Sequence, residues 1–417
     1  MSDQTPLIIA GDGETTAQIT ALRVTSLDVF RGISIFLMIF VDYAGSSLPS
    51  VTHAPWKGLH LADFVMPFFL FIAGVSLTLT NKRVTTKTQA TYKAILRTIK
   101  LFLLGIFLQG GYFNGINSLT YGVDIEKIRW MGILQRISIA YIIGALCEIW
   151  SSNFSPSDLT NGYFRKYYLQ WFTVMSLSCI YTSLLYGMYV PDWEYTTDQA
   201  SLFPVIDHDI SIIVNCSVRG DLGPACNSAG MIDRYFLGIE HLYRKPSYQN
   251  LKECSTLENE TFKDQPVWCQ APFDPEGILS SLMASVTCLI GLHFGHVLIQ
   301  LENHKGRLHH WLLFSMSLLV LGLLFSSAGI PIIKSLYTVS YMLVTTASAG
   351  IIFCTLYFLV DVLCYKSLFF VFEFIGRHAL SIFVLIASNI LVILIQGFYW
   401  KTPDNNIIHW IVSFVTR

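Results

Sequence analysis

Long apolar runs alternate with short polar connections along most of this chain. A helix needs about 20 mostly apolar residues to cross the hydrocarbon core of a bilayer. We therefore predict an all-α, polytopic membrane bundle of nine to ten spans. The nine predicted spans are 25–46, 59–80, 95–113, 131–150, 169–189, 278–300, 311–330, 336–360 and 369–396. Gly376 interrupts the last one, and the ending NIIHWIVSFVTR is either a truncated tenth span or an interfacial segment.

These runs divide the chain into four parts. Residues 1–24 are polar and lack the apolar core of a secretory signal, so we expect a disordered cytosolic tail. Residues 25–189 hold the first five spans, and residues 276–417 hold the sixth to the ninth or tenth. Between these two sets of spans lies a long polar insert, residues 190–275.

Lysine and arginine gather in alternate short connections between the predicted spans, at 81–93, 164–168 and 302–310. Cytosolic connections of membrane proteins are enriched in these two residue types. This bias predicts a cytosolic amino terminus. It places the first connection, 47–58, and the insert, 190–275, on the lumenal or exterior side.

The insert has the contents expected of a segment in an oxidising compartment. It contains N-glycosylation acceptors at Asn215 and Asn259, whereas a third, at Asn153, falls on the predicted cytosolic side and is discounted. An even number of cysteines there predicts two disulfides with three possible pairings, and unpaired thiols are the alternative. The four insert cysteines, of nine in the chain, are Cys216, Cys226, Cys254 and Cys269.

Composition agrees with the membrane assignment. Hydrophobic residues make up 53% of the chain and the mean hydropathy is +0.51. Charged residues make up only 13%, against roughly 25% in an ordinary soluble domain. A single soluble core cannot bury that much apolar surface, and the net charge of −1 argues against nucleic acid as a partner.

Three ionisable residues gather around the first connection, 47–58. Asp42 ends the first span, His53 lies in the connection, and Asp63 opens the second span. Such groups are costly at membrane depth, so they usually face a cavity and mark function. Histidine suits proton transfer or nucleophilic attack, and a carboxylate bonded to its second nitrogen fixes the tautomer. Either aspartate is a candidate for that carboxylate. The structural alternative is a solvated loop histidine beside a helix-capping Asp63.

The other end of the first span carries a candidate cationic site. Asp28 and Arg31 lie three residues apart, on one helix face. They form either an anchoring ion pair or a site for a phosphate-bearing donor. Arg31 and Asp42 are eleven residues apart, roughly 16 Å along a helix, so a donor with a long flexible arm can reach from one to the other. Arg136 is a further predicted cavity residue and donor contact. No metal-ligand spacing or Gly-rich phosphate loop is evident in the sequence, so we predict no metal.

Several motifs occur in the order found in one family. They are SLDVFRGISIFLMIFVDYAG, HAPWKGLHLADFVMPFFLFIAGVSL, MGILQRISIAY, AGMIDRYFLGIEHLY, FDPEGILSSL and IGRHALSIFVL. From about Ser26 to its end the chain resembles the heparan-alpha-glucosaminide N-acetyltransferases of lysosomal membranes, and in particular the plant-type members that lack the amino-terminal lumenal domain.

The resemblance implies an enzyme that passes acetyl from cytosolic acetyl-CoA to a lumenal amine, expected to be an amino sugar of a glycan. The family's catalytic histidine matches His53, and its functional asparagine matches Asp42. A carboxylate at that position can stabilise a charged imidazole, which an amide cannot. His53 is then the base or the acetyl-carrying nucleophile, and Asp42 orients it. A lysosomal or vacuolar membrane and a homodimer are further expectations.

Two other functions remain open at this point. Nine or ten spans with buried acids also suit a proton-coupled secondary transporter of a small solute. The absence of an evident inverted repeat of apolar segments in the sequence counts against this alternative. A third possibility is an inactive product with a shortened carboxy terminus.

Overall fold

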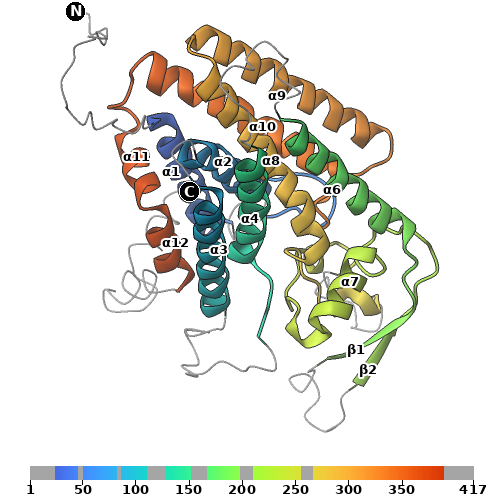
Figure 1. Ribbon diagram of the computed structural model, residues 1–417. Helices are drawn as coiled ribbons and strands as arrows, with labels where there is room; N and C mark the ends of the chain where they lie inside the picture. The colour runs from blue at the N-terminus through green and yellow to red at the C-terminus, as the bar shows by residue number, and fades with distance from the viewer. Residues whose placement is uncertain are drawn as a thin grey trace, which may run out of the picture.

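The computed structural model describes residues 24–45, 50–81, 86–109, 128–151, 167–197, 210–254 and 266–388. The predicted tail except its last residue, and the chain from 389 onward with the predicted tenth span, lie outside the described residues. The described part is mostly helical, with a small mixed unit at one end of a bundle (Figure 1). The bundle helices are α1 (Thr25–Ala44), α2 (Ala62–Asn81), α3 (Lys87–Gln109), α4 (Ile133–Ser151), α6 (Tyr168–Gly187), α8 (Ile278–Gln300), α9 (His304–Ser327), α10 (Val339–Tyr357) with a π-helical turn (Phe358–Val362), α11 (Phe370–Arg377) and α12 (Ala379–Ala387).

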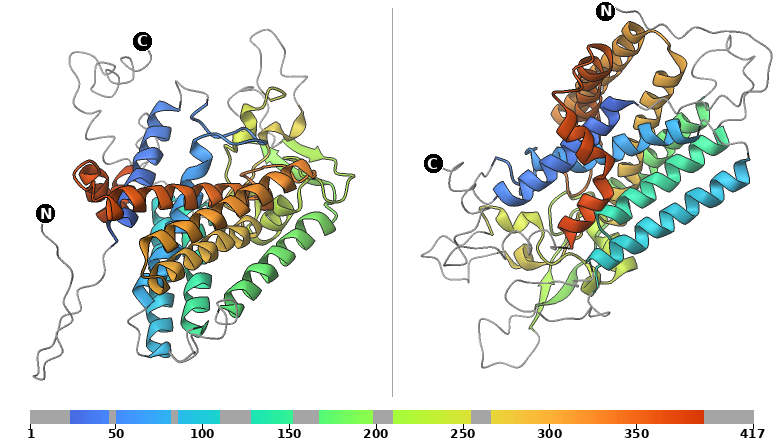
Figure 2. Two further views of the ribbon diagram at one scale, coloured as in Figure 1. Left: turned by 90° about the horizontal axis from the view of Figure 1, so that it is seen from above. Right: turned by 90° about the vertical axis from the view of Figure 1, so that its left-hand side faces the viewer.

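Helix α8 lies at the centre of the bundle because its side chains are almost all apolar or small. It packs along α2, where two glycines let the backbones approach. A Cβ at Gly74 would lie 2.0 Å from the Cys288 carbonyl oxygen, and one at Gly291 would lie 2.2 Å from that of Phe71. Small residues at contacts are usual for helices in membranes. Helix α9 lies on the outside, alongside α10 (Figure 2), and exposes most of its apolar side chains, as a lipid-facing helix does.

Five helices of the described part are long and apolar enough to cross a membrane, or six if the bent pair α11–α12 forms one span. The predicted number of nine to ten spans is therefore not confirmed. Helix α1 fails the test because it carries three charged residues, Asp28, Arg31 and Asp42. These three charged residues are the ones that the sequence predicted to be part of a functional site.

The last predicted span is broken, as expected from Gly376. Helices α11 and α12 meet at an angle of 73° at His378. Gly376 itself packs against α1, where a Cβ would lie 1.8 Å from the Asp28 carbonyl oxygen. The glycine therefore permits close packing of α11 on α1, and the bend follows two residues later.

The insert folds as a small unit of its own, which corrects the all-α assignment for this part of the chain. Its described residues, 190–197, 210–254 and 266–275, contain an antiparallel hairpin of β1 (Trp193–Thr197) and β2 (Ile210–Val214), helix α7 (Ser228–Leu237) and three short 3₁₀ turns. The two predicted disulfides are present. Asn215 is exposed, as a glycosylation acceptor must be, whereas Asn153 and Asn259 lie outside the described residues. The disulfides pair Cys216 with Cys226 and Cys254 with Cys269.

The insert packs over the connection between α1 and α2, and we call this end of the bundle the insert end. Trp56 is buried with its ring edge-to-face on Tyr248 and Phe273, and its indole N–H donates to the Leu222 carbonyl at 2.9 Å. On its other side the connection is hydrogen-bonded to the segment before α10, where the Gly58 N–H donates to the Ile332 carbonyl at 3.0 Å. The described residues of this connection, 50–61, are therefore held from two sides; 46–49 lie outside the description.

Candidate functional site

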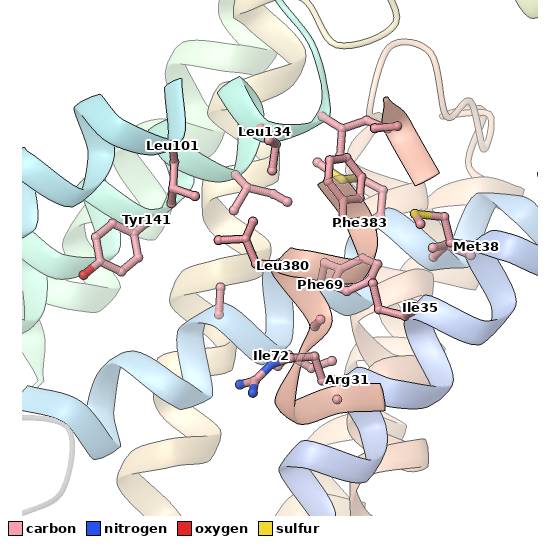
Figure 3. Close-up of a pocket in the computed structure, with 18 of the residues that line it drawn as sticks. Arg31, Ile35, Met38, Phe69, Ile72, Leu101, Leu134, Tyr141, Leu380 and Phe383 are labelled. Atoms are coloured by element: carbon pink, nitrogen blue, oxygen red, sulfur yellow. The ribbon is translucent and has the colours of Figure 1, made fainter. Parts of the chain in front are cut away.

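A cavity of about 680 Å³ runs between α1, α2, α3, α4, α11 and α12. Its middle is apolar, and Figure 3 shows Ile35, Phe69, Leu380 and Phe383 around it with Arg31 at one end. The polar residues that line it are Arg31, Asp42, His53, Ser76, Thr80, Arg97, Tyr141, Glu276, Lys334 and Arg377. One cavity thus contacts both residues around which the sequence predicted function, Arg31 and His53.

At the insert end, His53 is paired with Asp63. Its Nδ1 lies 3.0 Å from Asp63 Oδ1, and the other carboxylate oxygen accepts the backbone N–H of Ala54 at 3.2 Å and that of His60 at 2.9 Å. Asp63 is fully buried in the first turn of α2, where a helix N-terminus favours a carboxylate, whereas the His53 ring is half exposed toward the cavity. Three hydrogen-bonding groups hold the Asp63 carboxylate beside Nδ1 of His53. A proton on Nδ1 leaves Nε2 with a free lone pair.

Asp42 lines the same cavity and its side chain is exposed there. Eleven residues are close to three helical turns, so Asp42 and Arg31 project from the same face of α1. The structure places Asp63, and not Asp42, in contact with the ring of His53. The interpretation that Asp42 orients the ring stays a prediction, and Asp42 is instead available to a molecule in the cavity.

Lys334 is a site residue that the sequence analysis missed. It comes from the segment between α9 and α10, and its Nζ lies 2.6 Å from His53 Nδ1, 3.3 Å from His53 Nε2 and 3.3 Å from Asp63 Oδ1. Burial lowers the pKa of Lys334, although the carboxylates of Asp63 and Glu276 oppose this effect. One signal was present in the sequence: Lys334 is a basic residue in a short connection on the side that the charge bias leaves poor in lysine.

A second group of charges lies behind Lys334, before the start of α8. Arg129 donates to both carboxylate oxygens of Asp274, at 2.8 and 2.5 Å, and to Glu276 at 2.5 Å. Burial works against the ionisation of Glu276, but the positive charges of Arg129, Arg136 and Lys334 hold its pKa at about 2. Glu276, which lines the cavity, is therefore ionised and balanced by these positive charges.

Arg136, a predicted donor contact, belongs to this second group. Its guanidinium is buried, donates to the Pro275 carbonyl and to Ser280 Oγ, and lies over the ring of Tyr337 at 5.3 Å. It is in the first turn of α4, at the insert end, whereas Asp28 and Arg31 lie in the first turns of α1, at the opposite end. The structure therefore does not bring Arg136 together with them, and its role in donor binding stays a prediction.

The opposite end of the cavity is cationic. Arg31 pairs with Asp28 at 3.1 Å and donates to Ser76 Oγ at 3.0 Å, so the ion pair that the three-residue spacing predicted is formed. Arg97 from α3 and Arg377 from α11, which pairs with Glu373, line the cavity as well. Guanidinium groups suit phosphate because their N–H donors form a planar fork. This end can therefore accept a polyanionic head group.

Comparisons with known proteins agree with these features. Residues 23–205 match the family described as heparan-alpha-glucosaminide N-acetyltransferase, catalytic. The chain is 28% identical over 415 residues to the heparan-alpha-glucosaminide N-acetyltransferase of Mus musculus, covering 93% of this chain and 56% of that protein. It is also 28% identical over 403 residues to the protein of the same name from Homo sapiens, covering 92% and 55%.

The resemblance predicted from the sequence motifs is thereby confirmed, and the chain is similar to these N-acetyltransferases over most of its length. It spans about half the length of the curated relatives that it matches. The matched family segment contains α1, α2 and the connection between them, with His53 and Asp63.

Proposed function

We propose that this chain is a transmembrane N-acetyltransferase that moves an acetyl group from acetyl-CoA on the cytosolic side to an amine on the lumenal side. The observation that carries the proposal is the single cavity lined by Arg31 at one end and by His53 at the other. The names of the relatives support the same reaction class. The cytosolic amino terminus and the lysosomal or vacuolar membrane remain predictions from charge bias and resemblance.

The shape of the cavity suits coenzyme A, which has a phosphate-rich head on a long flexible arm. The phosphates pair with Arg31, Arg97 and Arg377 at the cationic end, and the arm lies along the apolar middle. The eleven residues from Arg31 to Asp42 correspond to roughly 16 Å along α1, about half the ~30 Å hydrocarbon core. The thioester then lies next to His53, where an acceptor from the lumenal side can meet it.

His53 uses Nε2 in either of two routes. As a general base it takes a proton from the acceptor amine while the amine attacks the acetyl carbon, the C–S bond breaks and the thiolate of coenzyme A receives a proton. As a nucleophile Nε2 attacks the acetyl carbon and the same C–S bond breaks, which releases the thiolate. The amine then attacks the acetyl carbon, the bond from Nε2 to that carbon breaks, and the proton that the amine loses is taken up by the thiolate or by solvent. Both routes need a lone pair on Nε2 and a proton on Nδ1. Asp63 Oδ1 lies 3.0 Å from Nδ1, accepts the hydrogen bond from Nδ1–H and stabilises the positive charge that forms on the ring.

The acceptor is an amine that enters from the insert end. We propose an amino sugar of a glycan, on the strength of the name of the relatives. Membrane lipid surrounds the outer helices, and the homodimer remains a prediction.

Transfer across sealed vesicles tests the proposal. The full chain in proteoliposomes receives labelled acetyl-CoA outside and glucosamine inside, and the label is followed by mass spectrometry. We expect label on the enclosed amine, and a loss of at least about 10²-fold in His53→Ala, as for removal of a positioned base. The control is His309→Ala, which changes an exposed histidine of α9.

The outcomes separate the candidates. Accumulation of unmodified glucosamine would support the transporter and contradict the enzyme. Undiminished transfer by a folded His53→Ala protein that binds acetyl-CoA would remove His53 from the mechanism. Acetyl found on His53 after incubation with acetyl-CoA alone would establish the nucleophile route.

A further inference from the structure

The acids that line the cavity differ in their charge partners. Of the described residues in its wall, Asp42 and Glu276 are the acids. Glu276 pairs with Arg129 at 2.5 Å, so its charge is balanced within the protein. Asp42 takes part in none of the ion pairs formed between described residues. Its carboxylate is exposed in the cavity and can therefore meet a cation that enters.

Cations that line the same cavity are held by other acids. Lys334 Nζ lies 3.3 Å from Asp63 Oδ1, so this ammonium is already paired at the insert end. Arg31 and Arg377 pair with acids of their own helices, at the opposite end. The charge of Asp42 is therefore left for a positively charged group of a bound molecule.

The place of Asp42 in α1 adds to the negative charge at this point. Asp42 lies in the last turn of the helix, and that turn contains no basic residue. The last carbonyl groups of a helix carry partial negative charge, so a cation is favoured there and a carboxylate is not. Asp63 has the opposite setting, in the first turn of α2, where a carboxylate is favoured. Only a cation from outside the helix can offset the unfavourable position of Asp42.

His53 lies close to this carboxylate. The two side chains line one cavity, and they are near enough for their charges to interact. A nitrogen atom held by Asp42 is thus near the ring that would take part in acetyl transfer.

Resting on the function proposed above, we propose that Asp42 binds the acceptor through its ammonium group, and that the acceptors are positively charged primary amines. Such an amine is mostly protonated below neutral pH. The bound ammonium loses one proton to solvent, and the neutral nitrogen then attacks the acetyl carbon by either route described above. In total, ammonium and thioester give amide, thiol and one proton. The amide has no charge, so the attraction to Asp42 is lost and the product is released.

Two sugars that differ in one group test the proposal without acetyl transfer. Glucosamine and glucose carry an ammonium and a hydroxyl on the same carbon, and saturation-transfer nuclear magnetic resonance measures their binding to the full chain in nanodiscs at pH 6. We expect the wild type to bind glucosamine at least about tenfold more tightly than glucose, as for one charge-assisted hydrogen bond.

Three variants locate the source of this preference. Asp42→Asn keeps the shape of the side chain but removes its charge, and we expect it to bind the two sugars about equally. Asp42→Glu keeps the charge, and we expect it to prefer glucosamine. The control is Glu240→Gln, which removes a carboxylate from an exposed ion pair of the insert and should retain the full preference.

Transfer kinetics provide a second readout. Methoxyamine is uncharged at pH 6, whereas glucosamine is charged. We expect Asp42→Asn to raise the KM for glucosamine at least about tenfold more than the KM for methoxyamine. A residue with a structural role alone would change both KM values by the same factor, and that result would contradict the proposal.

The binding outcomes separate this inference from the proposed function. Equal binding of glucosamine and glucose by the folded wild type would overturn the inference, and this comparison needs no variant. A preference for glucosamine that persists in folded Asp42→Asn would also overturn it, because another group would then hold the ammonium. A preference that depends on Asp42, in a protein that transfers no acetyl from acetyl-CoA, would instead contradict the proposed function and leave the ammonium site intact.

Discussion

The two ends of the cavity are built in different ways. At the cationic end, Asp28 and Arg31 pair over three residues of one helix. At the insert end, His53 meets Asp63 from the next helix and Lys334 from 281 residues away. A local pair of this kind forms wherever the helix forms, whereas the second cluster exists only if three segments are held together: the connection with His53, helix α2 and the segment before α10. The cationic end is therefore suited to binding a flexible donor, and the insert end to placing atoms for a reaction.

The charged side chains at the two ends also differ in how deeply they are buried. Arg31 is 27% exposed, whereas the Asp63 side chain has no exposed surface and carries bonds from two backbone N–H groups. A buried carboxylate in a fixed position affects a reaction more than a partly exposed cation does, because its interactions are less screened by solvent. Substitutions at the insert end are therefore expected to lower the rate, and those at the cationic end to weaken donor binding.

The largest expected effect is that of Asp63→Asn. An amide can donate to Nδ1 and so favours the ring with its proton on Nε2, which lowers kcat for acetyl transfer by about 10³- to 10⁴-fold. The matched variant is Asp42→Asn, which changes a carboxylate of the same cavity that does not contact the ring in the structure. We expect the fold-decrease in kcat of Asp42→Asn to be at least tenfold smaller than that of Asp63→Asn. The reverse order would show that Asp42 orients the ring, as the sequence analysis supposed.

The next effect is on the stability of the insert, which covers the reactive end. Burial raises the pKa of Asp233 to about 8, against the opposing effect of the Ile278 N–H at 2.8 Å. Between its unfolded value of 3.8 and about 8, the folded state holds more protons, so stability falls as pH rises through this range and is flat above it. From pH 5 to pH 8 the loss is at most about 4 kcal/mol.

Thermal unfolding of the purified chain at the two pH values measures this effect. Asp233→Asn keeps an acceptor for the Ile278 N–H and has no charge to bury, so most of the pH dependence should disappear. Asp221→Asn, a less buried aspartate of the same insert, should leave it unchanged. Equal pH dependence in the wild type and in Asp233→Asn would show that another group is responsible.

The smallest effect is expected at the cationic end. Arg31→Gln removes one charge-assisted contact to phosphate, worth about 1.5–3 kcal/mol, so the KM for acetyl-CoA rises about 10- to 100-fold while kcat changes little. Arg244→Gln, in an exposed ion pair of the insert, is the control for loss of a cation. A fall in kcat with an unchanged KM would contradict the division of roles between the two ends.

Sequence patterns predicted what depends on neighbours along the chain. The ion pair of Asp28 and Arg31 followed from helix geometry, and the number of disulfides followed from four cysteines in one polar insert. The interruption of the last predicted span was expected at Gly376, and the structure places the bend two residues later, at His378. The predicted span count is not confirmed, because α1, with three charged residues, and also α3 and α6 are not among the described helices that are long and apolar enough to span a membrane.

The amino-acid sequence by itself determined that this chain is a bundle of apolar helices with a cysteine-bearing insert, and that His53 lies among acids. These features rest on composition and local spacing. Only the tertiary structure decided that Asp63 rather than Asp42 contacts the ring, that Lys334 joins them, and which cysteines pair. These contacts depend on how helices far apart in the chain pack, through close approaches such as that of Gly74 and Gly291, and no local pattern encodes which distant surfaces meet.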